Sequence, residues 1–351
     1  MPVTESKRPG VYSQYTLTGA ANGKRLPKYA AVVAKSKLAP EGGCFEVNTY
    51  AQALALFGEP DNSAMLSAVA KVLFAYRPEK IFCCPVPFET GTAADYQACF
   101  DSLRQNEQVG AILCDSGEPA VLAALKDNVM AASANRKERY GFAAGNTAKE
   151  AADIAASLNC ERICVCCPPG SVVGCSGAIL TAASVAGAIL SMSDISQSLN
   201  GASLLGLEVI EALSEEDIEL LLGSGVLTCE QSAGSISVIK GLTTRTKTAG
   251  VPDNTFGSLT VMLEIDDVMI SVRNMLAVRL AGMKNTRMTR DSIKSQVTVE
   301  LMNKKEAGVI SDFADVVVKQ SSEDNSVCLV QLQFEAAGSI DQIYITAQIQ
   351  L

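Results

Sequence analysis

Histidine and tryptophan are absent from this sequence of 351 residues, and the lack of histidine restricts its chemistry most. Without an imidazole there is no Ser-His-Asp or Cys-His catalytic arrangement and no His-ligated metal site. The usual general base near neutral pH is also missing. An enzyme would have to use lysine, tyrosine or paired carboxylates. The absence of histidine therefore excludes most familiar hydrolytic mechanisms and leaves other kinds of catalysis open.

Positive charge is scarce. The formal net charge is −9 and the sequence pI is about 4.8, which argues against a general nucleic-acid-binding protein. Hydrophobic residues make up 48% and charged residues 19% of the chain, a balance typical of folded proteins. At this length we expect two or more domains.

Long hydrophobic runs are missing as well. Residues 1–8 have no apolar run of the kind that a secretory signal needs. The most apolar stretch, 177–190, is rich in small residues and too short to span a bilayer. We expect synthesis in the cytoplasm, no membrane association, and a buried core helix over this stretch.

Cysteine, by contrast, is abundant, with twelve residues. The run Cys160-x3-Cys164-x-Cys166-Cys167 lacks the CxxC pairs of zinc and iron–sulfur sites. Neighbouring residues on a strand also point to opposite faces. We predict no metal site, no cofactor, and thiols that serve as small apolar core residues in a reducing compartment.

Short apolar runs alternate with helical patterns from about residue 29 to residue 192. The predicted strands are 29–34, 81–84, 111–114, 140–143 and 161–167. The predicted helices are 61–76, 93–104, 118–133, 148–158 and 177–192. This alternation is typical of βαβ units. The predicted fold class is therefore α/β, with a central, mostly parallel sheet and flanking helices.

The later chain has a different pattern. A capped helix is predicted over 214–223, strands over 235–240 and 242–246, and a linker over 248–257. Beyond it come helical faces at 265–280 and 293–302 and strand candidates at 308–310, 313–318, 326–334 and 343–351. We predict four parts: an N-terminal extended arm (1–22), an α/β domain (23–247), an α+β C-terminal domain (248–339) and a C-terminal strand arm (340–351).

Both ends of the chain have strand patterns. Residues 343–351 alternate apolar and polar side chains, and residues 8–18 carry β-branched and aromatic ones. Each end pairs either within its own domain or with a sheet edge of a neighbouring subunit. The candidate arm residues are Val3, Pro9, Val11, Tyr12, Tyr15 and Leu17 at one end and Ile343, Tyr344, Ile345, Ala347, Ile349 and Leu351 at the other.

Two further segments suggest binding or chemistry. The glycine-rich run 170–177 follows a strand and opens a helix, which is where α/β proteins often hold phosphate, but it lacks P-loop and dinucleotide spacings. Asp95 and the Asp115-Ser116 pair are candidate carboxylate sites or, equally, turn and capping residues.

Basic residues cluster between residues 273 and 294, where Asp291 is the single acid. The cluster is either a solvated helix surface or a contact for an acidic partner. Its members are Arg273, Arg279, Lys284, Arg287, Arg290 and Lys294.

The order of several motifs resembles contractile tail sheath proteins of phages and R-type bacteriocins. Residues 206–227 are similar to a sheath stretch in which a capped helix precedes a Gly-Val turn. A strand and a Gly-x-Thr-Thr element at 241–244 follow, as in that family. Residues 8–12 resemble the family's N-terminal arm, and residues 342–349 its final strand.

This resemblance implies a structural subunit that polymerises as stacked hexameric rings around an inner tube and contracts to drive the tube through a cell envelope. It implies a protein that is not an enzyme and has no catalytic residues, with a subtilisin-like topology but no proteolytic activity. It also implies arms that join neighbouring subunits and a C-terminal domain against the tube. The expected partners are further copies of the chain, the inner tail tube protein, and baseplate and tail terminator proteins. Assembly would occur in the cytoplasm, with release on lysis.

Two other functions remain open from the sequence. One is a phosphate- or nucleotide-binding α/β enzyme that uses the 170–177 loop. The other is a non-contractile structural protein, such as a surface-layer or filament subunit. An enzyme predicts a discrete oligomer that a ligand stabilises, whereas a sheath predicts long polymers.

Overall fold

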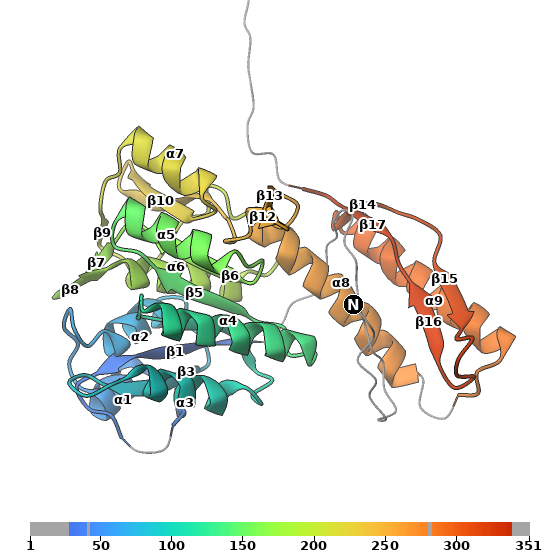
Figure 1. The fold of residues 1–351 in the computed structure, drawn as a ribbon, viewed down its shortest axis with the longest axis horizontal. Coiled ribbons are helices and arrows are strands. Elements are labelled where there is room, and N and C mark those ends of the chain that lie inside the picture. The colour runs from blue at the N-terminus through green and yellow to red at the C-terminus, as the bar shows by residue number, and fades with distance from the viewer. Residues whose placement is uncertain (1–27, 41–42, 280–282, 339–351) are drawn as a thin grey trace, which may run out of the picture. The chain divides into compact units, whose positions relative to one another are not determined.

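The computed structural model describes residues 28–40, 43–279 and 283–338 (Figure 1). Contacts divide the chain after Asp266, inside helix α8 (Leu259–Arg279). We call Lys24–Asp266 the α/β unit and the described residues from Asp267 onward the second unit. The domain boundary predicted from the sequence lies earlier, in the 248–257 linker. Residues 259 and 263 of α8 are buried, which explains why the start of this helix groups with the α/β unit.

The α/β unit is built on an eight-stranded sheet of order β11-β10-β6-β5-β4-β1-β3-β2. The inner strands run parallel, and the edge strands β2 and β11 run antiparallel to their neighbours. The predicted α/β class is therefore confirmed, with a mixed sheet whose interior is parallel. Its strands are β1 (Tyr29–Ser36), β2 (Phe45–Val47), β3 (Ile81–Pro87), β4 (Val109–Cys114), β5 (Tyr140–Ala144), β6 (Ile163–Cys167), β10 (Leu227–Ser232) and β11 (Ser235–Lys240).

Helices cover both faces of this sheet (Figure 1). Helices α3, α4 and α5 contribute to one apolar cluster with the strands, while α2 and α6 pack together and against the strands. The inner strands are buried on both faces, which accounts for their continuous apolar runs. The helices are α1 (Tyr50–Phe57), α2 (Leu66–Phe74), α3 (Ala93–Leu103), α4 (Pro119–Ala134), α5 (Ala148–Leu158), α6 (Ala178–Ser191) and α7 (Glu215–Gly223).

Two expectations about the elements of this unit are wrong, and one of its helices was not expected. The helix expected from residue 61 begins at Leu66, because the Asp61 carboxylate accepts hydrogen bonds from the backbone of Ser63 and Ala64 and closes a turn. Residues 242–246 form no strand and make only one isolated bridge, between Leu242 and Ser258. Helix α1, whose first turn is capped by a threonine at 49, was not predicted.

The second unit combines the rest of α8 with α9 (Arg287–Glu306) and four short strands. Strand β14 (Ile310–Phe313) pairs with β17 (Phe334–Ala336), and β15 (Val317–Gln320) pairs with β16 (Cys328–Gln331). Apolar residues of α8 and α9 form its core, including the predicted Val268, Val272, Leu276, Ile293, Val297 and Leu301. The expected strand 313–318 is wrong, since residues 314–316 separate β14 from β15.

No helix in the described part of the chain is both long enough and apolar enough to cross a membrane. Helix α6, which contains the most apolar stretch, is instead almost wholly buried against the sheet. The predicted core helix is therefore confirmed.

Candidate functional site

All residues predicted to form the two intersubunit arms lie outside the described residues. These are Val3, Pro9, Val11, Tyr12, Tyr15, Leu17, Ile343, Tyr344, Ile345, Ala347, Ile349 and Leu351. The described chain starts just before β1 and stops just after β17. Strand exchange between subunits stays a prediction.

The second unit contains strands with unpaired edges in its described part. Its two sheets, β14-β17 and β15-β16, have two strands each. Two-stranded sheets are only marginally stable alone, and each row of unpaired backbone groups is a template for a further strand. Residues at 318, 328 and 330 pack one face of β15-β16 onto the core of the unit, while Leu329 on the other face is 46% exposed. These edges are the candidate acceptor surfaces of the described chain.

The six predicted basic contact residues do not form one continuous exposed row. Arg273 on α8 is buried, Arg279 is the last residue of that helix, and Lys284 is exposed before α9 begins. On α9, Arg287 is exposed and weakly paired with Asp291, at 3.9 Å.

The two remaining basic residues are already engaged within the unit. The guanidinium of Arg290 donates to the side-chain oxygens of Asn285, at 2.9 Å, and Gln320, at 3.2 Å. The Lys294 ammonium lies 2.7 Å from the Asp315 carboxylate. Among the described side chains of this cluster, the most exposed cations therefore lie around the start of α9.

The glycine-rich segment 170–177 is a small β-hairpin. Strand β7 (Gly170–Val172) pairs with both β8 (Cys175–Gly177) and β9 (Val209–Ile210). Two side-chain amide oxygens accept hydrogen bonds from backbone N–H groups of this region. Asn62 accepts from residue 176, and Asn146 accepts from residue 178, the first residue of α6. The donors that a phosphate would require are thus largely used inside the fold.

The two candidate carboxylates have structural partners. Asp95 accepts from the backbone and hydroxyl of Thr92 and caps α3. Asp115 is mostly buried, and it accepts from the Tyr96 hydroxyl at 2.6 Å and from the Lys35 backbone N–H at 2.8 Å. Burial raises the pKa of Asp115, against the opposing effect of these hydrogen bonds. Both carboxylates therefore hold local structure.

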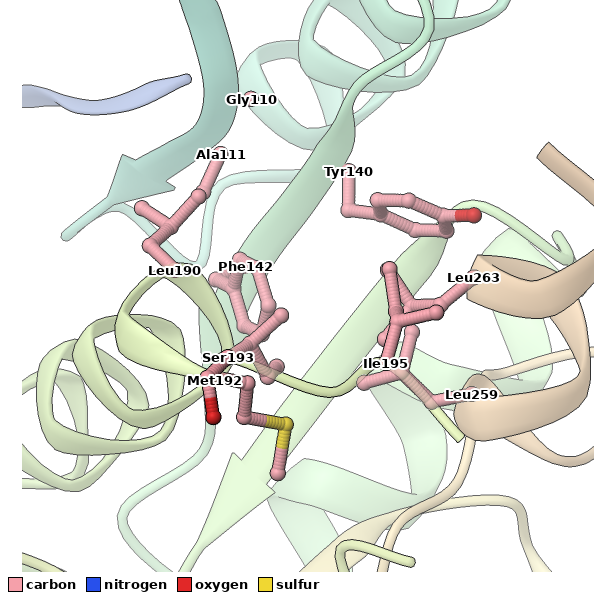
Figure 2. A pocket seen from close by; sticks show the side chains of 11 residues that line it. Gly110, Ala111, Tyr140, Phe142, Leu190, Met192, Ser193, Ile195, Leu259 and Leu263 are labelled. Carbon is pink, nitrogen blue, oxygen red and sulfur yellow. The ribbon is translucent and has the colours of Figure 1, made fainter. Parts of the chain in front are cut away.

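A cavity of about 30 Å³ lies near the start of β4 and β5 (Figure 2). Its lining is mainly apolar and includes Phe142 of β5, Leu190 of α6 and Leu263 of α8. Figure 2 shows these side chains converging from three elements. This volume has room for only about two water molecules, far less than a nucleotide needs.

Solved structures of similar fold cover almost the whole chain. A chain of the anti-feeding prophage baseplate matches with a TM-score of 0.74 and 13% identity, over 99% of this chain and 100% of that one. A sheath tail protein of Desulfitobacterium hafniense matches with 0.71 and 11%, over 97% and 100%. A chain of the contracted helical sheath of the anti-feeding prophage matches with 0.69 and 13%, over 98% and 99%.

The chain has the fold of contractile tail sheath proteins. The resemblance drawn from the sequence motifs is thereby confirmed at the level of the fold. No protein-family model matches the sequence, and the comparison with curated proteins gives no match. The fold is thus recognisable from the arrangement of elements, whereas overall sequence similarity is low.

Within this sheath fold, α8 carries buried charges that the sequence analysis did not single out. The Asp266 carboxylate receives two hydrogen bonds of 2.6 Å from the Arg162 guanidinium and one of 2.7 Å from the Tyr140 hydroxyl. In the second unit, Asp267 pairs with Lys304 of α9 at 2.9 Å. A sequence signal existed, since two adjacent acids interrupt an apolar helical face, but their partners are more than 30 residues away.

The cysteines of the sheath fold occupy its core, as predicted. Ten are buried, and Cys44 and Cys328 are intermediate. Burial raises the pKa of the Cys114, Cys164 and Cys229 thiols, so these sulfurs remain protonated at neutral pH. No group of metal-binding residues is found within the described residues.

Proposed function

We propose that this chain is the structural subunit of a contractile sheath, polymerising as stacked hexameric rings around an inner tube. The observation that carries the proposal is the full-length match to sheath structures, including helical sheaths in the contracted state. Those structures are of structural proteins, which favours a non-enzymatic role here. The occupied backbone donors of the 170–177 hairpin also disfavour the nucleotide-binding alternative.

In this proposal, strand exchange connects the subunits. The N-terminal and C-terminal arms complete sheets of neighbouring subunits, for which the open edges of the second unit are candidate acceptors. Main-chain hydrogen bonds keep neighbours attached, while head-to-tail contacts that do not close generate an open helical array. Contraction needs no nucleotide, because a metastable extended array relaxes to better-packed contacts.

Removing residues 343–351 tests the strand-exchange step. We expect the shortened chain to fold with an unchanged circular dichroism spectrum and to sediment as a monomer, because one donated strand is lost. The matched control replaces the apolar residues of the same segment conservatively, Ile343→Val and Ile349→Val, and should still polymerise. Persistent polymers of the shortened chain would contradict strand exchange through this end.

The inner tube contact is assigned to the second unit. We place it at the cluster Arg273, Arg279, Lys284, Arg287, Arg290 and Lys294, with the exposed residues around the start of α9 as its centre. Such a contact favours an acidic tube surface and weakens with salt.

Charge reversal tests this assignment. Arg287→Glu should reduce the share of sheath polymers that contain a tube, because it places like charges at the contact, while polymers without a tube still form. Lys149→Glu, an exposed reversal on α5 of the α/β unit, is the matched control. Electron micrographs of co-expressed sheath and tube proteins give the readout, and equal tube content in both variants would argue against the contact.

The remaining partners follow from the same proposal. One end of the sheath would contact a baseplate, as the similar baseplate chain suggests, and the other a tail terminator. The particle would assemble in the bacterial cytoplasm and leave the cell on lysis as a phage tail or bacteriocin.

A further inference from the structure

Three of the twelve cysteines gather at one edge of the central sheet. Cys84 lies in β3, Cys99 lies in α3, and Cys44 directly precedes β2. All three belong to one apolar cluster, in which Cys84 is fully buried, Cys99 is 6% exposed and Cys44 is half-buried. The Cys99 sulfur lies 4.0 Å from the carbonyl oxygen of Pro85, the residue after Cys84.

Strand register sets the distance between Cys44 and Cys84. Strand β2 is antiparallel to β3, with Phe45 opposite Cys83 and Glu46 opposite Phe82. Continuing that register by one residue places Cys44 opposite Cys84. Opposite residues of antiparallel strands have Cα atoms about 4.5–5.5 Å apart, which is within the range of disulfide-bonded cysteines. The Cys84 thiol also interacts with the thiols of both Cys44 and Cys99.

We propose that Cys44 and Cys84 are a redox-active thiol pair that a low-molecular-weight disulfide oxidises to a cross-link beside strands β2 and β3. The Cys44 thiolate first attacks one sulfur of the oxidant, forming a mixed disulfide and releasing one thiolate. The Cys84 thiol then attacks the Cys44 sulfur, and its proton passes to the second thiolate as that group leaves. The two cysteines lose two electrons in total, and the oxidant is reduced to two thiols.

Exposure and acidity both assign the first attack to Cys44. Its side chain is the accessible one of the pair. A hydrogen bond with Cys84 lowers the pKa of the Cys44 thiol, despite opposing burial, whereas the interaction with Cys44 raises the pKa of Cys84 well above its usual value. Cys44 is therefore the nucleophile, and Cys84 is the resolving thiol.

The cross-link would hold an edge of the sheet. Strand β2 has three residues and pairs only with β3 in the described sheet, so few backbone hydrogen bonds retain it. A particle made in a reducing cytoplasm and released into an oxidising medium would close this link after release. That last step rests on the proposed function, whereas the thiol chemistry does not.

Peptide mapping tests the pair directly. The reduced full-length protein is incubated with oxidised glutathione, its remaining thiols are alkylated without reduction, and its peptides are analysed by mass spectrometry. We expect one peptide pair linked through Cys44 and Cys84, with reductant restoring both thiols. Glutathione retained on Cys44, a link from Cys84 to Cys99, or no modification would each overturn the proposal.

Two variants sharpen the test. Cys84→Ala should accumulate glutathione on Cys44, because the resolving thiol is missing, and a Cys44–Cys99 link in this variant would contradict the pairing. Cys328→Ser, at the other half-buried cysteine, is the matched control and should behave as the unchanged protein does.

A thermal readout needs no substitution of a buried residue. Oxidation should raise the unfolding temperature of the unchanged protein, because the cross-link constrains the unfolded chain, and Cys44→Ser should abolish that rise. An equal rise in Cys44→Ser would refute the cross-link. The peptide map is read after digestion of the chain, so its result does not depend on whether the protein forms sheath polymers.

Discussion

Glu264 on α8 is a carboxyl group buried to 2% exposure, and its Oε2 has no hydrogen-bond partner among the described residues. Burial raises its pKa from 4.5 to about 8. Between these two values the folded chain keeps a proton that the unfolded chain releases. The contribution of this group to stability therefore falls as the pH rises through that window, and it is unchanged below and above it.

Replacing Glu264 by glutamine removes this titration. We expect the free energy of unfolding of Glu264→Gln, relative to the unchanged protein, to increase by about 2–4 kcal/mol between about pH 5 and about pH 8.5. Urea unfolding followed by circular dichroism at several pH values measures the difference. Parallel pH profiles of the two proteins would show that Glu264 does not titrate in this window.

The buried pair of Asp266 and Arg162 makes a second prediction at the residue scale. Asp266→Asn removes the carboxylate that pairs with the buried Arg162 guanidinium, 4% exposed in the pair, and should lower stability by about 3–5 kcal/mol. Asp101→Asn removes an exposed partner of Arg104 at 3.0 Å and should cost less than about 1 kcal/mol. The unfolding midpoints of both variants give the comparison, and equal midpoints would refute the importance of burial.

At the scale of elements, Gly187 allows α6 to pack closely against Tyr76, which follows the end of α2. A Cβ at this position would lie 2.4 Å from the ring of Tyr76, and the hydroxyl of the same tyrosine bonds Ser184 at 2.8 Å. We expect Gly187→Ala to destabilise the protein by about 1–3 kcal/mol, because overpacking outweighs the helix propensity of alanine.

Gly223 provides a matched comparison at the end of α7. It is helical, and a Cβ there meets nothing within 4 Å, so Gly223→Ala should be neutral or stabilise by up to about 1 kcal/mol. Thermal unfolding of the two variants gives opposite shifts on this account. A stabilising Gly187→Ala would show that Tyr76 moves aside at little cost.

Much of the α/β unit was predictable from local patterns. Helix α5 matches its predicted range of 148–158, and the buried inner strands match their apolar runs. Errors occurred where the backbone conformation depends on contacts that local patterns do not show. The Asp61 carboxylate closes a turn, so α2 begins later than predicted. The 242–246 segment is held by contacts distant in sequence. The three-residue strands β7 and β8 carried too little periodicity to be separated from a loop.

The candidate assembly site was less predictable than the fold. Charge and position indicated the cluster at 273–294, but burial of Arg273 and pairing of Lys294 with Asp315 depend on tertiary structure. The alternation of apolar and polar residues in 343–351 predicts a strand, but it does not indicate which strand edge this strand pairs with. The exchanged arms remain a prediction because their residues lie outside the described part of the chain. The subtilisin-like topology likewise remains a prediction.

At the scale of the whole molecule, the central claim is self-assembly into a sheath. The match to sheath structures spans nearly the full chain, and the described part of the second unit has open strand edges. Self-assembly itself stays a proposal that experiment has to test.

Negative-stain electron microscopy of the purified full-length protein tests that claim most directly. A sheath subunit should form hollow, ridged tubes at moderate protein concentration, because exchanged strands and head-to-tail contacts extend without closing. Compact particles of one size at every concentration would contradict it.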